Sequence, residues 1–117
     1  MPGSFGVEIV FRSKKLQKQC NDTKEIERTW GGEQARRLRR RLDDLRAALN
    51  LGDMRNLPGR CHELKGDRAG QLSLDLVHPD RLVIEPANNP LPFKPDGGLD
   101  WGAVTAVRIL EVVDTHD

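Results

Sequence analysis

At 117 residues, with 37% hydrophobic and 32% charged side chains, the chain is long enough for a modest core, and we expect one domain over residues 1–117. Only 4% of the residues are aromatic and none is tyrosine, which weighs against a protein that stacks single-stranded bases. The two cysteines lack the spacing of a metal site, so we expect them to be reduced thiols. No run approaches the ~20 apolar residues that span a membrane, and we expect a cytoplasmic protein.

The net charge of +1 conceals an uneven distribution along the chain. Residues 1–60 carry a net charge of +6, whereas residues 61–117 carry −5. A basic half favours contact with nucleic acid, whose phosphates dominate such binding. Solvated helix surfaces rich in Arg and Lys give the same composition, so composition alone does not separate the two interpretations.

The N-terminal half predicts one strand followed by helices. Residues 1–6 are expected to form a flexible leader, and the apolar alternation of residues 7–11 predicts a strand. Ser13 is a plausible cap for a short helix over residues 14–20, and residues 24–29 fit a further helical turn.

The strongest helical pattern spans residues 33–49, where apolar residues recur at spacings of three and four: Ala35, Leu38, Leu42, Leu45 and Leu49. Arginines occupy its remaining faces: Arg36, Arg37, Arg39, Arg40, Arg41 and Arg46. We interpret this cluster as a surface that binds RNA phosphates, chiefly through Arg36, Arg37 and Arg40. For any single arginine, the alternative is a solvated face that pairs with nearby Asp43 and Asp44.

The C-terminal half predicts strands over residues 60–65, 72–76, 81–85 and 104–113, with a glycine-rich turn at 66–70. The β-branched run at 104–113 is typical of a central strand buried on both sides. Residues 86–101 hold four of the seven prolines and predict a long surface loop. The predicted fold is therefore α+β, with two N-terminal helices packed on a small, mostly antiparallel sheet.

Cationic side chains and a C-terminal histidine suggest chemistry on RNA. Cleavage of RNA without a metal requires a general base, a general acid and fixed cations that stabilise the phosphorane. Lys65, Arg68 and Arg81 flank one turn system and are candidate cations, and the imidazole of His116 titrates near neutral pH. Each also has an ordinary explanation: a solvated lysine, an Arg68 salt bridge to Asp67 or Asp80, and a frayed terminus at His116.

Three segments together resemble the HigB-like plasmid-maintenance killer toxins of the RelE/ParE superfamily, over residues 9–116. They are LPGRCHELKGDRAG at 57–70, RLVIE at 81–85 and VVDTH at 112–116. The resemblance implies a RelE-like toxin fold and a toxin that cleaves messenger RNA in the translating ribosome without metal or cofactor. It implies that Lys65, Arg81, Asp114 and His116 are catalytic. Our hypothesis is that Asp114 orients His116; binding of a lysine is the alternative.

The resemblance also implies partners. These are the ribosome with its messenger RNA, and a helix-turn-helix antitoxin of the HigA type, through which DNA is contacted indirectly; no membrane partner is implied.

Two features depart from the family pattern: Thr115 replaces the tyrosine of the terminal motif, and the loop at 86–101 is longer than usual. Two alternatives therefore stand beside the endonuclease: a ParE-like inhibitor of DNA gyrase, and a decayed member that only binds its antitoxin.

Overall fold

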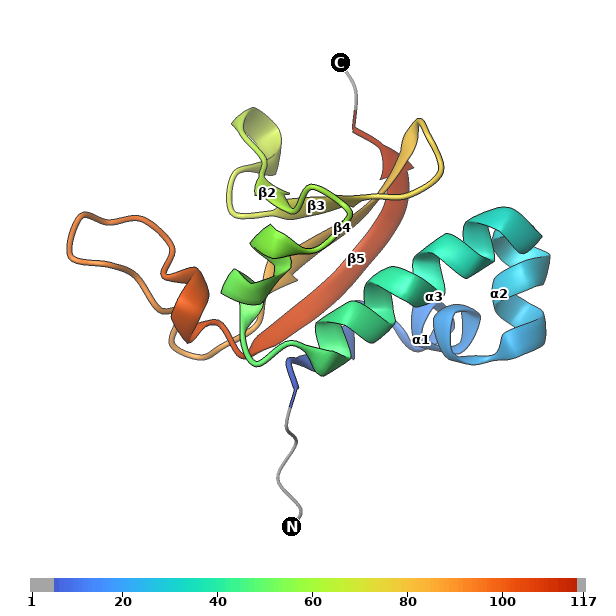
Figure 1. Ribbon diagram of the computed structural model, residues 1–117, viewed down its shortest axis with the longest axis horizontal. Coiled ribbons are helices and arrows are strands. Elements are labelled where there is room, and N and C mark those ends of the chain that lie inside the picture. The colour runs from blue at the N-terminus through green and yellow to red at the C-terminus, as the bar shows by residue number, and fades with distance from the viewer. Residues whose placement is uncertain (1–5, 116–117) are drawn as a thin grey trace, which may run out of the picture.

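The computed structural model describes residues 6–115, in which helices lie on one face of a five-stranded mixed sheet (Figure 1). The strand order is β1-β5-β4-β3-β2. The strands are β1 Glu8–Phe11, β2 His62–Glu63, β3 Leu72–Asp75, β4 Asp80–Pro86 and β5 Ala106–Asp114. β5 runs parallel to β1, and the other neighbouring pairs are antiparallel, so the predicted α+β class with a mostly antiparallel sheet is confirmed.

Three α-helices follow β1, not the two that the sequence predicted: α1 Lys14–Asn21, α2 Thr23–Trp30 and α3 Gly32–Ala47. Asp22 separates the first two and caps the second, because its carboxylate accepts hydrogen bonds from the backbone N–H groups of Lys24 and Glu25. These hydrogen bonds lower the pKa of Asp22 below its ordinary value. A capped second helix thus forms where the sequence indicated only a helical turn.

The apolar stripe of α3 forms the centre of the core. Leu38, Leu42 and Leu45 are almost fully buried and belong to one cluster with the sheet residues Leu72 and Ile109. The predicted stripe was wrong at Leu49, which is 69% exposed. The reason is that α3 ends at Ala47 and the extended backbone of the next residue turns the chain away from the helical register.

β5 lies between β1 and β4, as expected for a central strand, but only one of its faces is fully apolar. Val107 and Ile109 are in the core, whereas Arg108 and Glu111 are partly exposed and form ion pairs. Burial on both sides was therefore wrong. The face away from the helices instead carries charged side chains, although Val83, opposite Glu111, and Leu110 are also buried outside the main core cluster.

The remaining boundaries differ from the prediction at a few positions. The strand expected at 60–65 is confined to β2, and short 3-10 helices form at η1 Leu51–Asn56, η2 Gly66–Arg68 and η3 Trp101–Ala103. The loop is shorter at both ends than the predicted range 86–101, because Pro86 is the last residue of β4 and Trp101 is buried at the start of η3. The rest of this loop projects from the body of the protein (Figure 1). Of the predicted leader, residues 1–5 lie outside the described residues.

Both cysteines, Cys20 and Cys61, are free and buried. Burial raises the pKa of Cys61 from 9.0 to about 12 and that of Cys20 to about 11. No helix in residues 6–115 has the length and apolar character needed to cross a membrane.

These thiols should be unreactive in the native protein. At pH 8, we expect an aromatic disulfide reagent to label neither cysteine until urea unfolds the chain, because the thiolate is the reactive form. Unfolded thiols ionise above pH ~9 while the buried ones stay protonated, so the free energy of unfolding should fall as pH rises past that value. Rapid labelling of the folded protein would contradict this expectation.

Candidate phosphate-binding site

A pocket of about 860 Å³ lies at the C-terminal end of β5. It brings together three of the predicted cations, Lys65, Arg68 and Arg81, although they come from different segments of the chain. The pocket is lined by Leu64, Lys65, Gly66, Asp67, Arg68, Gln71, Arg81 and Thr115. The C-terminal end of β5, the β3–β4 turn and η2 lie at the same end of the molecule, toward the top of the view (Figure 1).

The turn that carries Lys65 and Arg68 is fixed to the sheet by a long-range ion pair. Gly66 adopts φ 63°, which a residue with a side chain rarely adopts, and it starts η2 directly after Lys65. Arg68 Nη1 then donates to Gln71 Oε1 and to Glu111 Oε2, at 3.0 Å each. The predicted Arg68 partners, Asp67 and Asp80, were therefore wrong. Since Glu111 neutralises Arg68, this arginine contributes less free charge to the pocket than Lys65 does.

Lys65 and Arg81 supply the cationic atoms of the pocket that remain available. Lys65 is exposed and forms no ion pair with any residue in 6–115. Arg81 lies opposite Asp75 in the β3–β4 ladder, and its Nε is 3.4 Å from Asp75 Oδ1. This single contact orients the guanidinium and leaves its terminal nitrogens to bind another group.

The terminal motif is only partly within the described residues. Asp114 lies opposite Asp80 at the end of the β4–β5 ladder, and Thr115 lines the pocket. His116 lies outside the described residues, so its catalytic role and its orientation by Asp114 stay predictions.

The predicted arginine cluster of α3 gathers at a second pocket, of about 530 Å³. Arg36, Arg37 and Arg40 are exposed and line it with Glu33, Arg41 and Pro58. The cluster is thus brought together as expected, except that Arg41 is only 5% exposed. Burial, followed by the charge of Arg37, lowers the pKa of Arg41 below its ordinary value.

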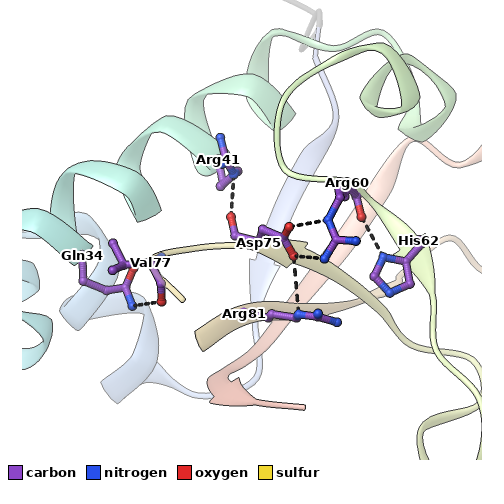
Figure 2. Close-up of polar contacts among 7 residues, drawn as sticks. All are labelled: Gln34, Arg41, Arg60, His62, Asp75, Val77 and Arg81. Carbon is purple, nitrogen blue, oxygen red and sulfur yellow. Dashed lines mark hydrogen bonds and ion pairs between the residues drawn. The ribbon is translucent and has the colours of Figure 1, made fainter. Parts of the chain in front are cut away.

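Arg41 leads to a contact network centred on Asp75 (Figure 2). Its Nε donates to the backbone carbonyl of Asp75 at 2.8 Å. The Asp75 carboxylate binds Arg60, with Nε to Oδ2 at 2.6 Å, and also Arg81. The Asp75 N–H donates to the Gly59 carbonyl at 2.7 Å. One aspartate therefore contacts α3, the segment before β2, and β4.

A second contact fixes the β3–β4 turn to α3. The buried side chain of Gln34 accepts from the Val77 N–H at 2.8 Å (Figure 2). It also donates to Asp80 Oδ2 at 3.2 Å. Because Arg81 follows this turn directly, the helix helps to set where its guanidinium lies.

Sequence reasoning missed Asp75 and Arg60. The predicted hairpin at residues 72–85 indicated a role for Asp75, since strands joined at residues 78–80 place Asp75 and Arg81 opposite each other on one face. It gave none for Arg60, which reaches Asp75 from a backbone at φ 48°. Its hydrogen bond to Asp75, together with the charge of that carboxylate, raises the pKa of Arg60.

No protein-family model matches the chain, and no curated protein matches it. Within residues 6–115, no group of three or more His, Cys, Asp or Glu side chains is placed to hold a metal ion. The described site offers a ligand one unpaired lysine and an arginine with free donors, beside an arginine held by a carboxylate; the carboxylate of Asp67 also lines the pocket. Such a donor set suits a phosphate.

Proposed function

We propose that this chain is a HigB-like toxin of a type II toxin-antitoxin system that cleaves messenger RNA in the ribosome without a metal. The observation that carries the proposal is the convergence of Lys65 and Arg81 on one pocket whose wall includes Thr115. Three motifs far apart in the sequence meet there, and they are the ones in which the chain resembles these toxins. A RelE-like arrangement of the fold is part of the same proposal.

The proposed reaction is attack of the RNA 2′-hydroxyl on the adjacent phosphorus. A general base takes the hydroxyl proton, the bond to the 5′-oxygen breaks, and a general acid gives that oxygen a proton. Lys65 and Arg81 bind the phosphate oxygens and stabilise the charge that develops on them. Arg68, held by Glu111, shapes the pocket wall and adds a weaker cation.

The proton transfers are assigned to His116, the residue after Thr115, with Asp114 as its orienting group. His62 is a second source of an imidazole. Its Nδ1 lies 2.7 Å from the Arg60 carbonyl, so Nδ1 carries the proton and Nε2 is left as the acceptor in the neutral ring. Comparing His116→Ala with His62→Ala therefore identifies which imidazole the reaction needs.

The proposed partners are the translating ribosome and a helix-turn-helix antitoxin of the HigA type. Exposed Arg36, Arg37 and Arg40 support ribosome binding, because they gather at one pocket separate from the site of cleavage. Guanidinium groups bind phosphates without reading sequence, which fits contact with ribosomal RNA.

Expression of the native chain without an antitoxin tests the proposed function. Growth arrest with messenger RNA cuts, mapped by primer extension and dependent on active translation, would support it. Arrest with DNA damage but no RNA cuts would instead indicate a gyrase inhibitor. No arrest by the native chain, but arrest after Thr115→Tyr, would indicate a member that has lost its activity through the Thr115 replacement.

Replacing Arg36, Arg37 and Arg40 together by alanine should weaken ribosome binding at every salt concentration. Each lost phosphate contact removes about 0.7–0.9 from the slope of log affinity against log salt, so the slope should fall by roughly 2–3. Arg39→Ala is the matched control, because Arg39 is on the same helix but pairs with Glu27. An unchanged slope in the triple variant would reject this surface as an RNA contact.

A further inference from the structure

Two guanidinium groups share one carboxylate at the polar face of the sheet. Arg60 contacts Asp75 through Nε at 2.6 Å and Nη2 at 3.4 Å, and Arg81 contacts the same carboxylate at 3.4 Å (Figure 2). The group therefore keeps one net positive charge. Each guanidinium has five N–H donors, so most of the donors stay available after Asp75 is bound.

Arg60 is held in place although its side chain is 69% exposed. Its backbone is in the left-handed region at φ 48°, which is uncommon for a residue other than glycine. Contacts on both sides hold it there: the Arg60 carbonyl accepts from His62 Nδ1, and the preceding Gly59 carbonyl accepts from the Asp75 N–H. Backbone strain of this kind persists where the surroundings impose it and is concentrated at binding sites.

A small hollow of about 70 Å³ lies between these side chains, lined by Arg60, Asp75, Leu76, His78, Pro79, Asp80 and Arg81. It shares Arg81 with the larger pocket of Lys65, so the two spaces are adjacent. Of its two carboxylates, Asp75 is engaged by arginines, whereas Asp80 accepts from the neutral amide of Gln34 and keeps its negative charge. The donors toward the hollow are those of the two guanidiniums, with the imidazole of His78 beside them.

We propose that Arg60 and Arg81, positioned by Asp75, bind a second phosphate of the RNA strand, next to the phosphate held by Lys65 and Arg81. Arg81 lines both spaces and thus contacts both phosphates. Arg60 is then a binding residue of the substrate strand, and Asp75 is a positioning residue that acts through both arginines. That the ligand is RNA rests on the proposed function. The position extends the bound strand away from the pocket and toward Gly59 and Arg41, on the side of α3.

The Asp75→Asn substitution tests the positioning role of Asp75, because positioning and simple electrostatics predict opposite changes in RNA affinity. Asparagine has the same shape, and the backbone bonds of residue 75 to Gly59 and Arg41 do not involve the carboxylate. Removing a negative charge from a basic surface would by itself tighten RNA binding. Loss of the positioning group should instead weaken it, by about fivefold, the upper range for an exposed ion pair.

The experiment measures binding of a fluorescent single-stranded 2′-O-methyl RNA of mixed sequence, which lacks the attacking hydroxyl and stays intact. Asp75→Asn is expected to bind about fivefold more weakly than the native chain. Arg60→Ala is expected to bind about tenfold more weakly, with a salt slope lower by about 0.7. Matched controls come from an ion pair on α2: Glu25→Gln and Arg28→Ala should bind as the native chain does.

Tighter binding by Asp75→Asn, an unchanged salt slope for Arg60→Ala, or no binding by the native chain would each overturn the inference. Thermal unfolding of each variant establishes that it is folded, and Arg60→Lys provides a second variant that keeps the charge but loses the planar fork. The outcomes differ from those of the proposed function. Messenger RNA cleavage with unaltered binding by both variants would reject only the second phosphate, and altered binding without cleavage would reject only the nuclease.

Discussion

Lys65→Ala is expected to lower the rate of messenger RNA cleavage about 100- to 1,000-fold, the usual loss for one group that stabilises transition-state charge. The reason is that Lys65 is the unpaired cation of the pocket, whereas Arg68 is bound to Glu111. Its backbone is extended, at φ −123° and ψ 178°, so alanine fits there without strain. Ribosomes programmed with one defined message, sampled over time, would give the rate.

The control is Lys94→Ala, an exposed lysine of the projecting loop that pairs with Asp96. It should cleave as fast as the native chain, and both variants should unfold at the native temperature. Lys65→Arg tests whether charge alone suffices, since it keeps the cation but changes its shape. Cleavage by Lys65→Ala at the native rate would remove this residue from the site and with it the main support for the proposed chemistry.

Local patterns in the sequence predicted much of the fold. The spacing of Leu38, Leu42 and Leu45 identified α3, and the alternation at residues 72–76 identified β3 with its apolar face toward the core. Both patterns reflect one face packed against a neighbour, which needs no knowledge of that neighbour. Failure came at Leu49, where the apolar spacing continued but the helix did not.

The candidate site was predictable in its members but not in its contacts. Lys65 and Arg68 are close in sequence, and Arg81 lies near the start of β4, the second strand of the hairpin that follows them, so their convergence follows from local topology. The partner of Arg68 is Glu111, which is 43 residues away, and no local signal specifies that pair. Whether an arginine is free or neutralised thus depends on tertiary structure, although the sequence alone identifies it as a candidate.

Arg41 is another arginine whose role depends on tertiary structure and not on its sequence context. In the sequence it is one of six arginines on a helix, and in the fold it is the buried one, bound to the Asp75 carbonyl. A Cβ on Gly59 would lie 2.8 Å from Arg41 Nε, so the glycine is what allows the side chain to pass. The composition does not distinguish these six side chains, whereas packing makes Arg41 a structural residue and leaves the others as a surface cluster.

Trp101→Ala is expected to reduce the free energy of unfolding by about 3–5 kcal/mol, the range for removing a buried large aromatic side chain. Trp101 is 5% exposed, and the Arg55 guanidinium lies 4.0 Å from its ring centroid. Its Nε1 donates to Glu63 Oε2 at 2.9 Å, which ties η3 to β2. Urea unfolding followed by far-ultraviolet circular dichroism measures the loss without relying on tryptophan fluorescence.

Trp101→Phe divides this effect into packing and hydrogen bonding. It keeps most of the buried ring but loses the bond to Glu63, whose carboxylate is exposed to water, so we expect a cost of only about 1 kcal/mol. Trp30→Ala, at the partly exposed end of α2, should also cost less than Trp101→Ala. Since Glu63 precedes Lys65 by two residues, Trp101→Phe should slow RNA cleavage more than its small loss of stability explains. Equal losses of stability in the Phe and Ala variants would show that the hydrogen bond, not the packed ring, holds β2 in place.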